Sequence, residues 1–371
     1  MRKAFLLIFC SFFVYAGHAQ VTNSGMTDNR DSIENEKINI SGYVDVYYGF
    51  SFNQPKSSDR PYTVSAPRHN EININLAYID IQYRSDRVRA RFVPGVGTYI
   101  NSNYASESGT LKNIIEANAG VKLSKKKEVW MDVGVIGSPF TNETAISKDH
   151  LMYTRSFSAE YAPYYLSGAR LTVPLSPKIK AYAYVINGWQ QISDVNNPLS
   201  VATQIEYKPS DYILFNWNTY VGSEESNQNP TYKNRYFTDL YAIYSKGKFS
   251  FTSNVYVGMQ GVKDTLLAKT TTRHWWQANF IGKYAFNQQH SVSGRIEYFE
   301  DLHEIVAKPI TNTHGFSTYS TGLCYNLQIG KHAIFRVEGK HYFSDKSVYI
   351  SKDNLPIKTD NLLIGNLTVW F

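Results

Sequence analysis

Apolar and polar residues alternate with a period of two along almost the whole chain from Ile38 to its end. Successive side chains of a β-strand point to opposite faces of a sheet, so this period predicts strands with one apolar and one polar face. Turn residues divide this region into sixteen predicted strands, which are residues 38–52, 71–84, 86–100, 111–124, 127–138, 164–174, 178–189, 199–208, 211–223, 234–246, 248–261, 272–286, 289–302, 313–328, 331–344 and 360–371. The pattern predicts an all-β protein.

The connections between the predicted strands are alternately short and long. The short ones are residues 85–86, 124–127, 175–177, 209–210, 247, 287–288 and 328–330, and the long ones are residues 53–70, 101–110, 139–163, 190–198, 224–233, 262–271, 303–312 and 345–359. Tight turns at one rim and long loops at the other are typical of bacterial outer-membrane barrels, whereas a sandwich or propeller has no reason to sort its loops this way. We therefore predict a transmembrane antiparallel up-and-down β-barrel of about 16 strands, with short periplasmic turns and long extracellular loops.

The last predicted strand ends on the C-terminal residue of the sequence. Leu363, Gly365, Leu367, Val369 and Phe371 share one face of this strand. An unpaired apolar strand would invite aggregation, but an outer-membrane barrel closes on such a strand. We expect the barrel-assembly machinery to engage the chain through the strand that ends at Phe371.

The first 19 residues have the pattern of a secretory signal peptide. Arg2 and Lys3 precede a short apolar run, and small residues that end at Ala19 suit cleavage. The apolar run of about 13 residues is too short to span a bilayer as a helix, for which about 20 are needed. We expect residues 1–19 to be removed, residues 20–37 to form a flexible periplasmic segment, and residues 38–371 to form the barrel in the outer membrane.

The alternation also assigns each side chain to the lipid or to the lumen. On strand 86–100, Phe92 shares a face with Val88, and Arg89 and Arg91 share the other face. Because a charge facing hydrocarbon is costly, the arginines should point into the lumen. The same rule places basic residues on the inner wall at Arg89, Arg91, Lys122, Arg170, Lys180, Arg295, Arg336 and Lys340, and acidic residues at Asp45, Asp80, Glu116, Asp132, Glu206, Asp239, Glu297 and Glu338. Such a balanced, charged interior indicates a wet lumen, and a barrel of about sixteen strands is wide enough for a water-filled channel.

The aromatic residues fit the same plan. They make up 15% of the chain, with 29 tyrosines, although the mean hydropathy is -0.36. In a barrel only alternate residues meet lipid, and Tyr and Trp gather at the membrane interfaces. The tryptophans expected to anchor the interfaces are Trp189, Trp217, Trp275, Trp276 and Trp370. A set of tyrosines could form a sugar-stacking path or fill the lumen and the interfaces, and it comprises Tyr43, Tyr47, Tyr182, Tyr184, Tyr212 and Tyr220.

Charge and cysteine content exclude other classes of protein. The formal net charge of +7 could suggest a nucleic-acid partner, but the charges are scattered and the signal peptide takes the chain away from nucleic acid. Of the two cysteines, Cys10 lies in the signal peptide, and Cys324 alone cannot form an intramolecular disulfide.

For enzymes the sequence holds no Gly-x-Ser-x-Gly, His-Glu-x-x-His or phosphate-binding glycine loop. Asp301, His303 and Glu304 form the nearest cluster of catalytic residue types, and such clusters are common in exposed loops. We therefore expect no enzymatic activity, no metal and no cofactor.

The longest loop, residues 139–163, connects the fifth and sixth predicted strands. In general porins the loop at this position folds into the lumen and narrows it. Its charged residues would then face the arginines of the third strand and place a transverse field across the constriction, and they are Glu143, Lys148, Asp149, Arg155 and Glu160. An ordinary surface loop is the alternative. The arginines of strand 86–100 could likewise attract anions or merely pair with acidic neighbours.

One stretch resembles a known family. Residues 182–189 (YAYVINGW), with Ser167-Gly168-Ala169-Arg170-Leu171 upstream, resemble the porin-2, OmpL-like β-barrel family of Bacteroidota and other Gram-negative bacteria, in which a strand runs into Asn-Gly-Trp. The Gly-His-Ala-Gln end of the signal peptide also resembles exported proteins of that phylum. The resemblance spans residues 38–371 and implies a diffusion porin in the outer membrane. It supplies no defined set of substrate residues.

The sequence therefore predicts an outer-membrane porin that passes small hydrophilic solutes or ions through a charged, water-filled lumen. The alternative is a non-conducting outer-membrane barrel that acts as an adhesion or assembly module through its extracellular loops. In both cases the barrel would be surrounded by outer-membrane lipid. The oligomeric state stays open, although porins of this size are often homotrimers.

Overall fold

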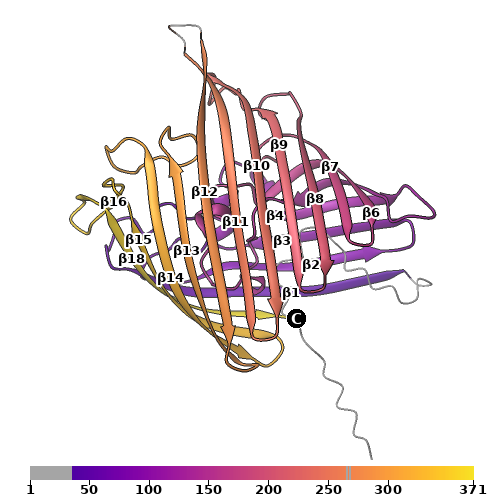
Figure 1. The fold of residues 1–371 in the computed structure, drawn as a ribbon, viewed down its shortest axis with the longest axis horizontal. Helices are drawn as coiled ribbons and strands as arrows, with labels where there is room; N and C mark the ends of the chain where they lie inside the picture. Colours follow the sequence, from indigo (N-terminus) through magenta and orange to yellow (C-terminus); the bar gives the residue numbers. More distant parts are fainter. Residues whose placement is uncertain (1–35, 265, 267–268) are drawn as a thin grey trace, which may run out of the picture.

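The computed structural model describes residues 36–264, 266 and 269–371 of the chain. The predicted signal peptide and residues 20–35 of the predicted periplasmic segment lie outside these residues. Sixteen long strands form a closed barrel (Figure 1), and they are β1 (Lys37–Ser51), β2 (Ile72–Arg84), β3 (Val88–Val96), β4 (Ile114–Lys122), β5 (Trp130–Gly137), β6 (Tyr165–Ser176), β7 (Ile179–Ile186), β8 (Ser200–Ser210), β9 (Ile213–Ser223), β10 (Tyr232–Lys246), β11 (Phe249–Lys263), β12 (Thr270–Ala285), β13 (His290–Asp301), β14 (Phe316–Ile329), β15 (Ala333–Phe343) and β18 (Thr359–Trp370).

Each barrel strand pairs with its neighbours in sequence, and the first strand closes the barrel against the last. β1 and β18 are antiparallel, with Tyr43 opposite Trp370 and Ser51 opposite Leu362. The backbone groups of Gly42 and Phe371 exchange two hydrogen bonds of 3.1 Å, so the C-terminal residue also takes part in the closure. The prediction of a sixteen-stranded antiparallel barrel is confirmed.

Short turns join the strands at one rim, and the C-terminus lies at the same rim (Figure 1). Long connections occupy the other rim, and the last of them contains a small hairpin of β16 (Tyr349–Ile350) and β17 (Pro356–Ile357). This arrangement follows from the alternation of short and long connections in the sequence.

The third strand is shorter than its predicted range of 86–100. It ends at Val96, and Gly97 has a φ of 137°, which turns the chain away from the sheet. The short helix α1 (Thr98–Asn103) and the 3₁₀ helix η1 (Gly109–Asn113) follow. The residues after the turn therefore cover the interior near the long-loop rim and do not extend the wall.

The pairing of the first and second strands contains one irregularity. Asp45 pairs with Leu76 and Val46 pairs with Ile74, so Asn75 is the extra residue of a bulge. The bulge turns the buried side chain of Asn75 inward, where Nδ2 donates to Asp45 Oδ2 at 2.9 Å.

The outer wall is apolar and the inner wall is polar. Phe92 is 44% exposed on the outside of β3, whereas the neighbouring Arg91 points inward. In the described part of the chain no helix is long and apolar enough to cross a membrane.

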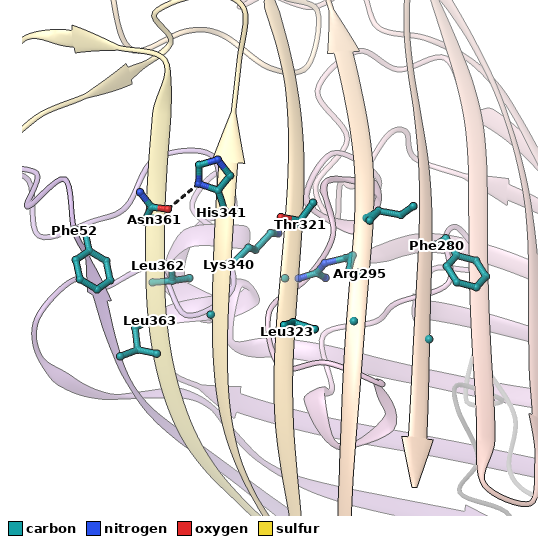
Figure 2. A pocket seen from close by; sticks show the side chains of 15 residues that line it. Phe52, Phe280, Arg295, Thr321, Leu323, Lys340, His341, Asn361, Leu362 and Leu363 are labelled. Carbon is teal, nitrogen blue, oxygen red and sulfur yellow. Dashed lines mark hydrogen bonds between the residues drawn. The ribbon is translucent and has the colours of Figure 1, made fainter.

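Figure 2 shows a hollow on the wall formed by β12–β15 and β18. Its volume is about 870 Å³, and exposed Phe280, Leu323 and Leu363 line it together with glycines such as Gly294 and Gly339. The exposed apolar side chains put this hollow on the outer face of the barrel.

Candidate functional site

The first group of inner-wall charges lies on β3, β5 and β6. Arg89 binds Asp132 with two hydrogen bonds, Nε to Oδ1 at 2.7 Å and Nη2 to Oδ2 at 2.6 Å. Arg170 Nη2 donates to the same Asp132 Oδ2 at 2.9 Å. Two guanidinium groups on one carboxylate leave a net positive charge on this part of the wall.

A second group lies beside it. Arg91 Nη2 is 2.8 Å from Asp80 Oδ2 on β2, and its Nη1 is 2.7 Å from Glu116 Oε1 on β4. The side chain of Arg91 remains 16% exposed and that of Glu116 12% exposed. Arg89 and Arg91 are therefore paired with acidic neighbours, while water still reaches them. We call the residues Arg89, Arg91, Asp80, Glu116, Asp132 and Arg170 the wall cluster.

The remaining predicted charges of this side lie closer to the short-turn rim. Lys122 pairs with Glu128, and Lys180 Nζ is 4.0 Å from Glu206 Oε1. The side chain of Lys180 is half exposed. These residues surround the mouth of the barrel at that rim.

Residues 139–163, here called the inner loop, cross the interior between β5 and β6. Ser147 Oγ is 2.7 Å from Tyr43 OH and 3.2 Å from Asp45 Oδ2, both on β1, and it is 3.2 Å from Thr368 Oγ1 on β18. The backbone N–H of Thr141 donates to Asp239 Oδ2 on β10 at 2.9 Å. The loop therefore reaches strands that lie four or five positions around the barrel from β5 and β6, in both directions.

A charged group on β13 and β15 holds the middle of the inner loop. Glu338 Oε2 accepts the backbone N–H groups of Tyr153 and Thr154 at 2.8 and 2.9 Å. Glu297 Oε2 accepts the N–H of Phe157 at 2.7 Å. Lys340 Nζ donates to the carbonyl oxygen of Arg155 at 3.0 Å.

These wall charges also pair with one another. Arg295 Nη2 is 3.1 Å from Glu338 Oε1, and Lys340 Nζ is 2.8 Å from Glu297 Oε1. The four side chains are at most 2% exposed. We call Arg295, Glu297, Glu338 and Lys340 the loop clasp.

The charged residues of the inner loop do not face the third strand, contrary to prediction. Glu143 lies 3.5 Å from Arg295 on β13, and Arg155 donates to carbonyl groups of its own loop. Lys148 pairs with the adjacent Asp149 at 2.9 Å. Glu160 accepts from Thr63 and Val64 in the first long connection. The inner loop lies over the side of the barrel that carries Arg295 and Glu338, so its charged side chains find their partners there and within the loops.

The loop also binds neutral polar residues that the sequence analysis did not single out. Asn142 Nδ2 donates to Thr252 Oγ1 and Asn279 Oδ1 at 3.0 and 3.1 Å, and Asn218 Nδ2 donates to the carbonyl oxygen of Pro139 at 3.1 Å. Asn218, Asn254 and Asn279 are buried. In the sequence, these asparagines alternate with apolar residues that face lipid. The period of two could therefore have identified them as inward-facing.

Several aromatic residues lie inside the barrel rather than at its interfaces. Trp275 is fully buried on the inner wall, and Trp189 packs against it and against Tyr220 and Phe237. The prediction that Trp189 and Trp275 are interface anchors is therefore wrong. Trp217, in contrast, is exposed on the outer face.

The tyrosine set divides in the same way. Tyr43, Tyr47, Tyr184 and Tyr220 are buried in the interior, and Tyr212 is exposed. The buried tyrosines pack against other side chains and the inner loop, which leaves no open stacking surface for a sugar at these four residues.

Arg336 lies on the inner wall between Asn326 on β14 and Asn366 on β18. It is only 1% exposed, and none of its three guanidinium nitrogen atoms has a hydrogen-bond partner among the residues that the structure describes. It therefore differs from every basic residue of the wall cluster and the loop clasp.

His150 of the inner loop has a defined protonation pattern. Its Nε2 accepts the backbone N–H of Thr144 at 2.9 Å. Burial, followed by the nearby charges of Arg155 and Arg336, lowers the pKa of His150 well below its usual value. The imidazole is therefore neutral at neutral pH, and its proton resides on Nδ1.

The cluster of catalytic residue types near the end of β13 supports loop structure. Asp301 Oδ2 accepts the backbone N–H groups of Val306 and Ala307, and Glu304 Oε1 accepts that of Gly315 at 2.7 Å. Within the described residues no group of three or more His, Cys, Asp or Glu side chains could hold a metal ion.

Comparison with family models assigns the chain to a protein family. Residues 37–371 match the family described as putative beta-barrel porin-2, OmpL-like. The chain belongs to this family. No functionally curated protein matches the sequence.

Solved outer-membrane proteins share the fold of this porin-2 family member. The outer membrane channel DcaP of Acinetobacter baumannii is similar with a TM-score of 0.62 and 10% identity, over 92% of this chain and 99% of that one. The anion-selective porin from Comamonas acidovorans has a TM-score of 0.60 and 8% identity, over 91% and 100% of the two chains. OmpF of Salmonella typhi has a TM-score of 0.59 and 11% identity, over 91% and 98%. The protein is thus a multi-pass outer-membrane β-barrel of the porin class.

Proposed function

We propose that this barrel lets small hydrophilic solutes diffuse across the outer membrane, with the inner loop as the constriction of the lumen. The observation that carries the proposal is the position of the inner loop, which is bound inside the barrel to β1, β10, β13, β15 and β18. A loop held in this way narrows the lumen and fixes its cross-section.

The side of the lumen left to the solute is the one lined by the wall cluster. Three of its side chains keep contact with water, since those of Arg89, Arg91 and Glu116 are 11%, 16% and 12% exposed. Charged residues at a narrow aqueous passage attract ions of opposite sign and exclude apolar solutes. The pairing of the arginines with Asp80, Asp132 and Glu116 supports weak rather than strong ion selectivity.

The surroundings of the barrel follow from the same proposal. The apolar outer wall faces outer-membrane lipid, the short turns face the periplasm, and the C-terminal strand presents Phe371 to the barrel-assembly machinery. A homotrimer remains one assembly that fits a porin of this size. One structure similar to this chain, OmpT of Vibrio cholerae, is described in a trimer form.

Single-channel recording in a planar bilayer tests the proposed passage. The wild-type protein should give steady open steps, and a variant that lacks residues 143–160 should give larger ones because the inner loop no longer fills the lumen. Deletion of residues 226–229, in a long connection at the rim, serves as the control and should leave conductance unchanged.

Deleting the inner loop removes the loop groups that the clasp binds, but the four clasp charges still pair with one another, so the deletion variant keeps a balanced inner wall. A folded deletion variant with wild-type conductance would show that the inner loop does not limit the passage.

A specific observation also favours the non-conducting alternative. Inward-facing side chains at mid-barrel are buried on many strands, among them Asp45, Asn218, Asp239, Asn254, Glu338 and Asn366. A barrel sealed by its inner loop would act through its long connections, as an adhesion or assembly module. Wild-type protein that inserts into the bilayer and never opens would support this function and reject diffusion.

A further inference from the structure

The buried, unpartnered guanidinium group of Arg336 is the feature of the interior that the proposed function leaves unexplained. An arginine side chain stays protonated in proteins and presents five N–H donors. Burying a charged group without hydrogen-bond partners is costly, and buried charges are normally paired. The group therefore requires acceptors that the described residues do not supply.

The carboxylates closest to this position are already engaged. Asp45 accepts hydrogen bonds from Asn75, Ser147 and Asn366. Glu338 accepts from Arg295 and from the inner loop. Neither carboxylate forms an ion pair with Arg336 among the described residues, so the guanidinium group keeps its N–H donors free although Asp45 lies close enough to feel its charge.

Two further donors lie on the elements around Arg336. Lys283, an inward-facing residue of β12, lies in one row across the strands with Ser293, Cys324 and Glu338, and Arg336 is two residues from Glu338 on the same face of β15. His150 lies at the end of the 3₁₀ turn of the inner loop, which crosses these strands. His150 Nδ1 is buried and has no hydrogen-bond partner among the described residues, and it carries the proton because Nε2 is an acceptor. Lys283 Nζ likewise forms no ion pair within the described part of the chain.

The contacts of the inner loop place Arg336, Lys283 and His150 on the same side of the loop. His150 follows Ser147, which is bound to β1 and β18, and precedes Met152, which packs with Cys324 and Ile281 of β14 and β12. Arg336 on β15 lies between β14 and β18. The donors thus come from strands that the loop crosses in succession, and neither Arg336 nor Lys283 forms an ion pair with a carboxylate within the described part of the chain.

We propose that Arg336, Lys283 and the Nδ1–H group of His150 form a binding site for a small oxyanion on the inner wall. The guanidinium group offers paired donors that match an oxyanion, the ammonium adds charge, and the neutral imidazole adds a directed hydrogen bond. The site deepens the proposed diffusion function, on which it rests for the route by which the anion enters. It assigns small anions of the phosphate or carboxylate type as preferred solutes.

Inorganic phosphate is the probe for this site. Binding to the detergent-folded barrel is measured by isothermal titration calorimetry at constant ionic strength. Wild-type protein should bind phosphate saturably. Arg336→Gln should raise the apparent Kd for phosphate by at least about tenfold, because it removes the central charge. Arg336→Lys should retain part of the affinity, since it keeps the charge and loses the paired geometry.

Two controls make the outcome decisive. Arg87→Gln changes an exposed arginine in the turn before β3 and should bind phosphate as the wild type does. Lys283→Gln provides a second variant at a half-buried position in case Arg336→Gln fails to fold, and it should also weaken binding. Equal affinity in wild type, Arg336→Gln and Lys283→Gln, or no saturable binding in wild type, would overturn the proposal.

The binding assay is independent of conduction. Phosphate binding that depends on Arg336 in a barrel that never opens in a bilayer would reject the diffusion function and keep the site. Steady conductance without Arg336-dependent binding would reject the site and keep the diffusion function.

Discussion

The wall cluster and the loop clasp contain the same types of residue, yet they belong to different structures. Arg91 of the wall cluster binds carboxylates on the two adjacent strands and is 16% exposed. Arg295 of the loop clasp binds carboxylates on its own and a nearby strand and on the inner loop, and it is fully buried. A balanced set of charges on the inner wall therefore does not tell whether the lumen beside it holds water. That depends on whether the inner loop covers the charges.

The difference also separates two energetic roles. Removing one partner from a fully buried pair leaves an uncompensated charge and costs several kcal/mol, whereas a partly hydrated pair contributes less. The clasp should therefore control stability and the seating of the inner loop. The wall cluster should chiefly control the field that a passing ion meets.

The largest effect is expected for Glu338→Ala in the clasp. It removes the carboxylate nearest to Arg295 and the acceptor of two inner-loop N–H groups, so the free energy of unfolding should fall by about 3–5 kcal/mol. Urea unfolding in detergent or lipid vesicles measures this loss. Glu338→Gln, which keeps an acceptor oxygen, should lose less, and an unchanged midpoint in both variants would show that the clasp does not stabilise the barrel.

An intermediate effect is expected for Phe92→Arg, on the outer face beside the wall cluster. A second arginine next to Arg91 would point into lipid, at a cost of about 2–4 kcal/mol near the bilayer midplane. The folded fraction in vesicles should drop, while Phe92→Leu folds normally. Normal folding of Phe92→Arg would mean that the two faces of β3 do not differ in their surroundings.

A smaller effect on stability is expected for Arg91→Ser in the wall cluster. It leaves Asp80 and Glu116 without their shared partner and should cost about 1–3 kcal/mol, because Glu116 is partly exposed and Asp80 keeps a hydrogen bond from Gln82. The reversal potential in a salt gradient should shift towards cations, since a fixed positive charge is lost from the wall. Arg91→Lys should keep the wild-type potential, and an unchanged potential in Arg91→Ser would place the ion path away from this cluster.

The sequence was sufficient for the barrel wall because each strand carries its own signal. The facing of Arg91 and Phe92 follows from a period of two, and β1 and β18 were recognisable at the two ends of the region. The third strand was predicted too long because the alternation continues past Gly97, where a single backbone angle ends the strand.

The contents of the lumen could not be predicted to the same degree. The alternation places Trp275 on the inner face only if the inward-facing positions of its strand are known. Trp276 is adjacent and lies on the other face, so the sequence did not show which of the two tryptophans faces lipid. The partner of Glu143 is Arg295, 152 positions away, because the path of the inner loop depends on contacts with distant strands. No local pattern records such a path.

The contacts of Ser147 connect this path to the order of folding. Its hydroxyl contacts Tyr43 and Asp45 on the first barrel strand and Thr368 on the last, which are separated by more than 320 positions. These contacts can all form only when the two ends of the chain have met. Seating of the inner loop and sealing of the barrel are therefore a single late event of high contact order, and their common rate should be slow compared with the formation of the individual hairpins.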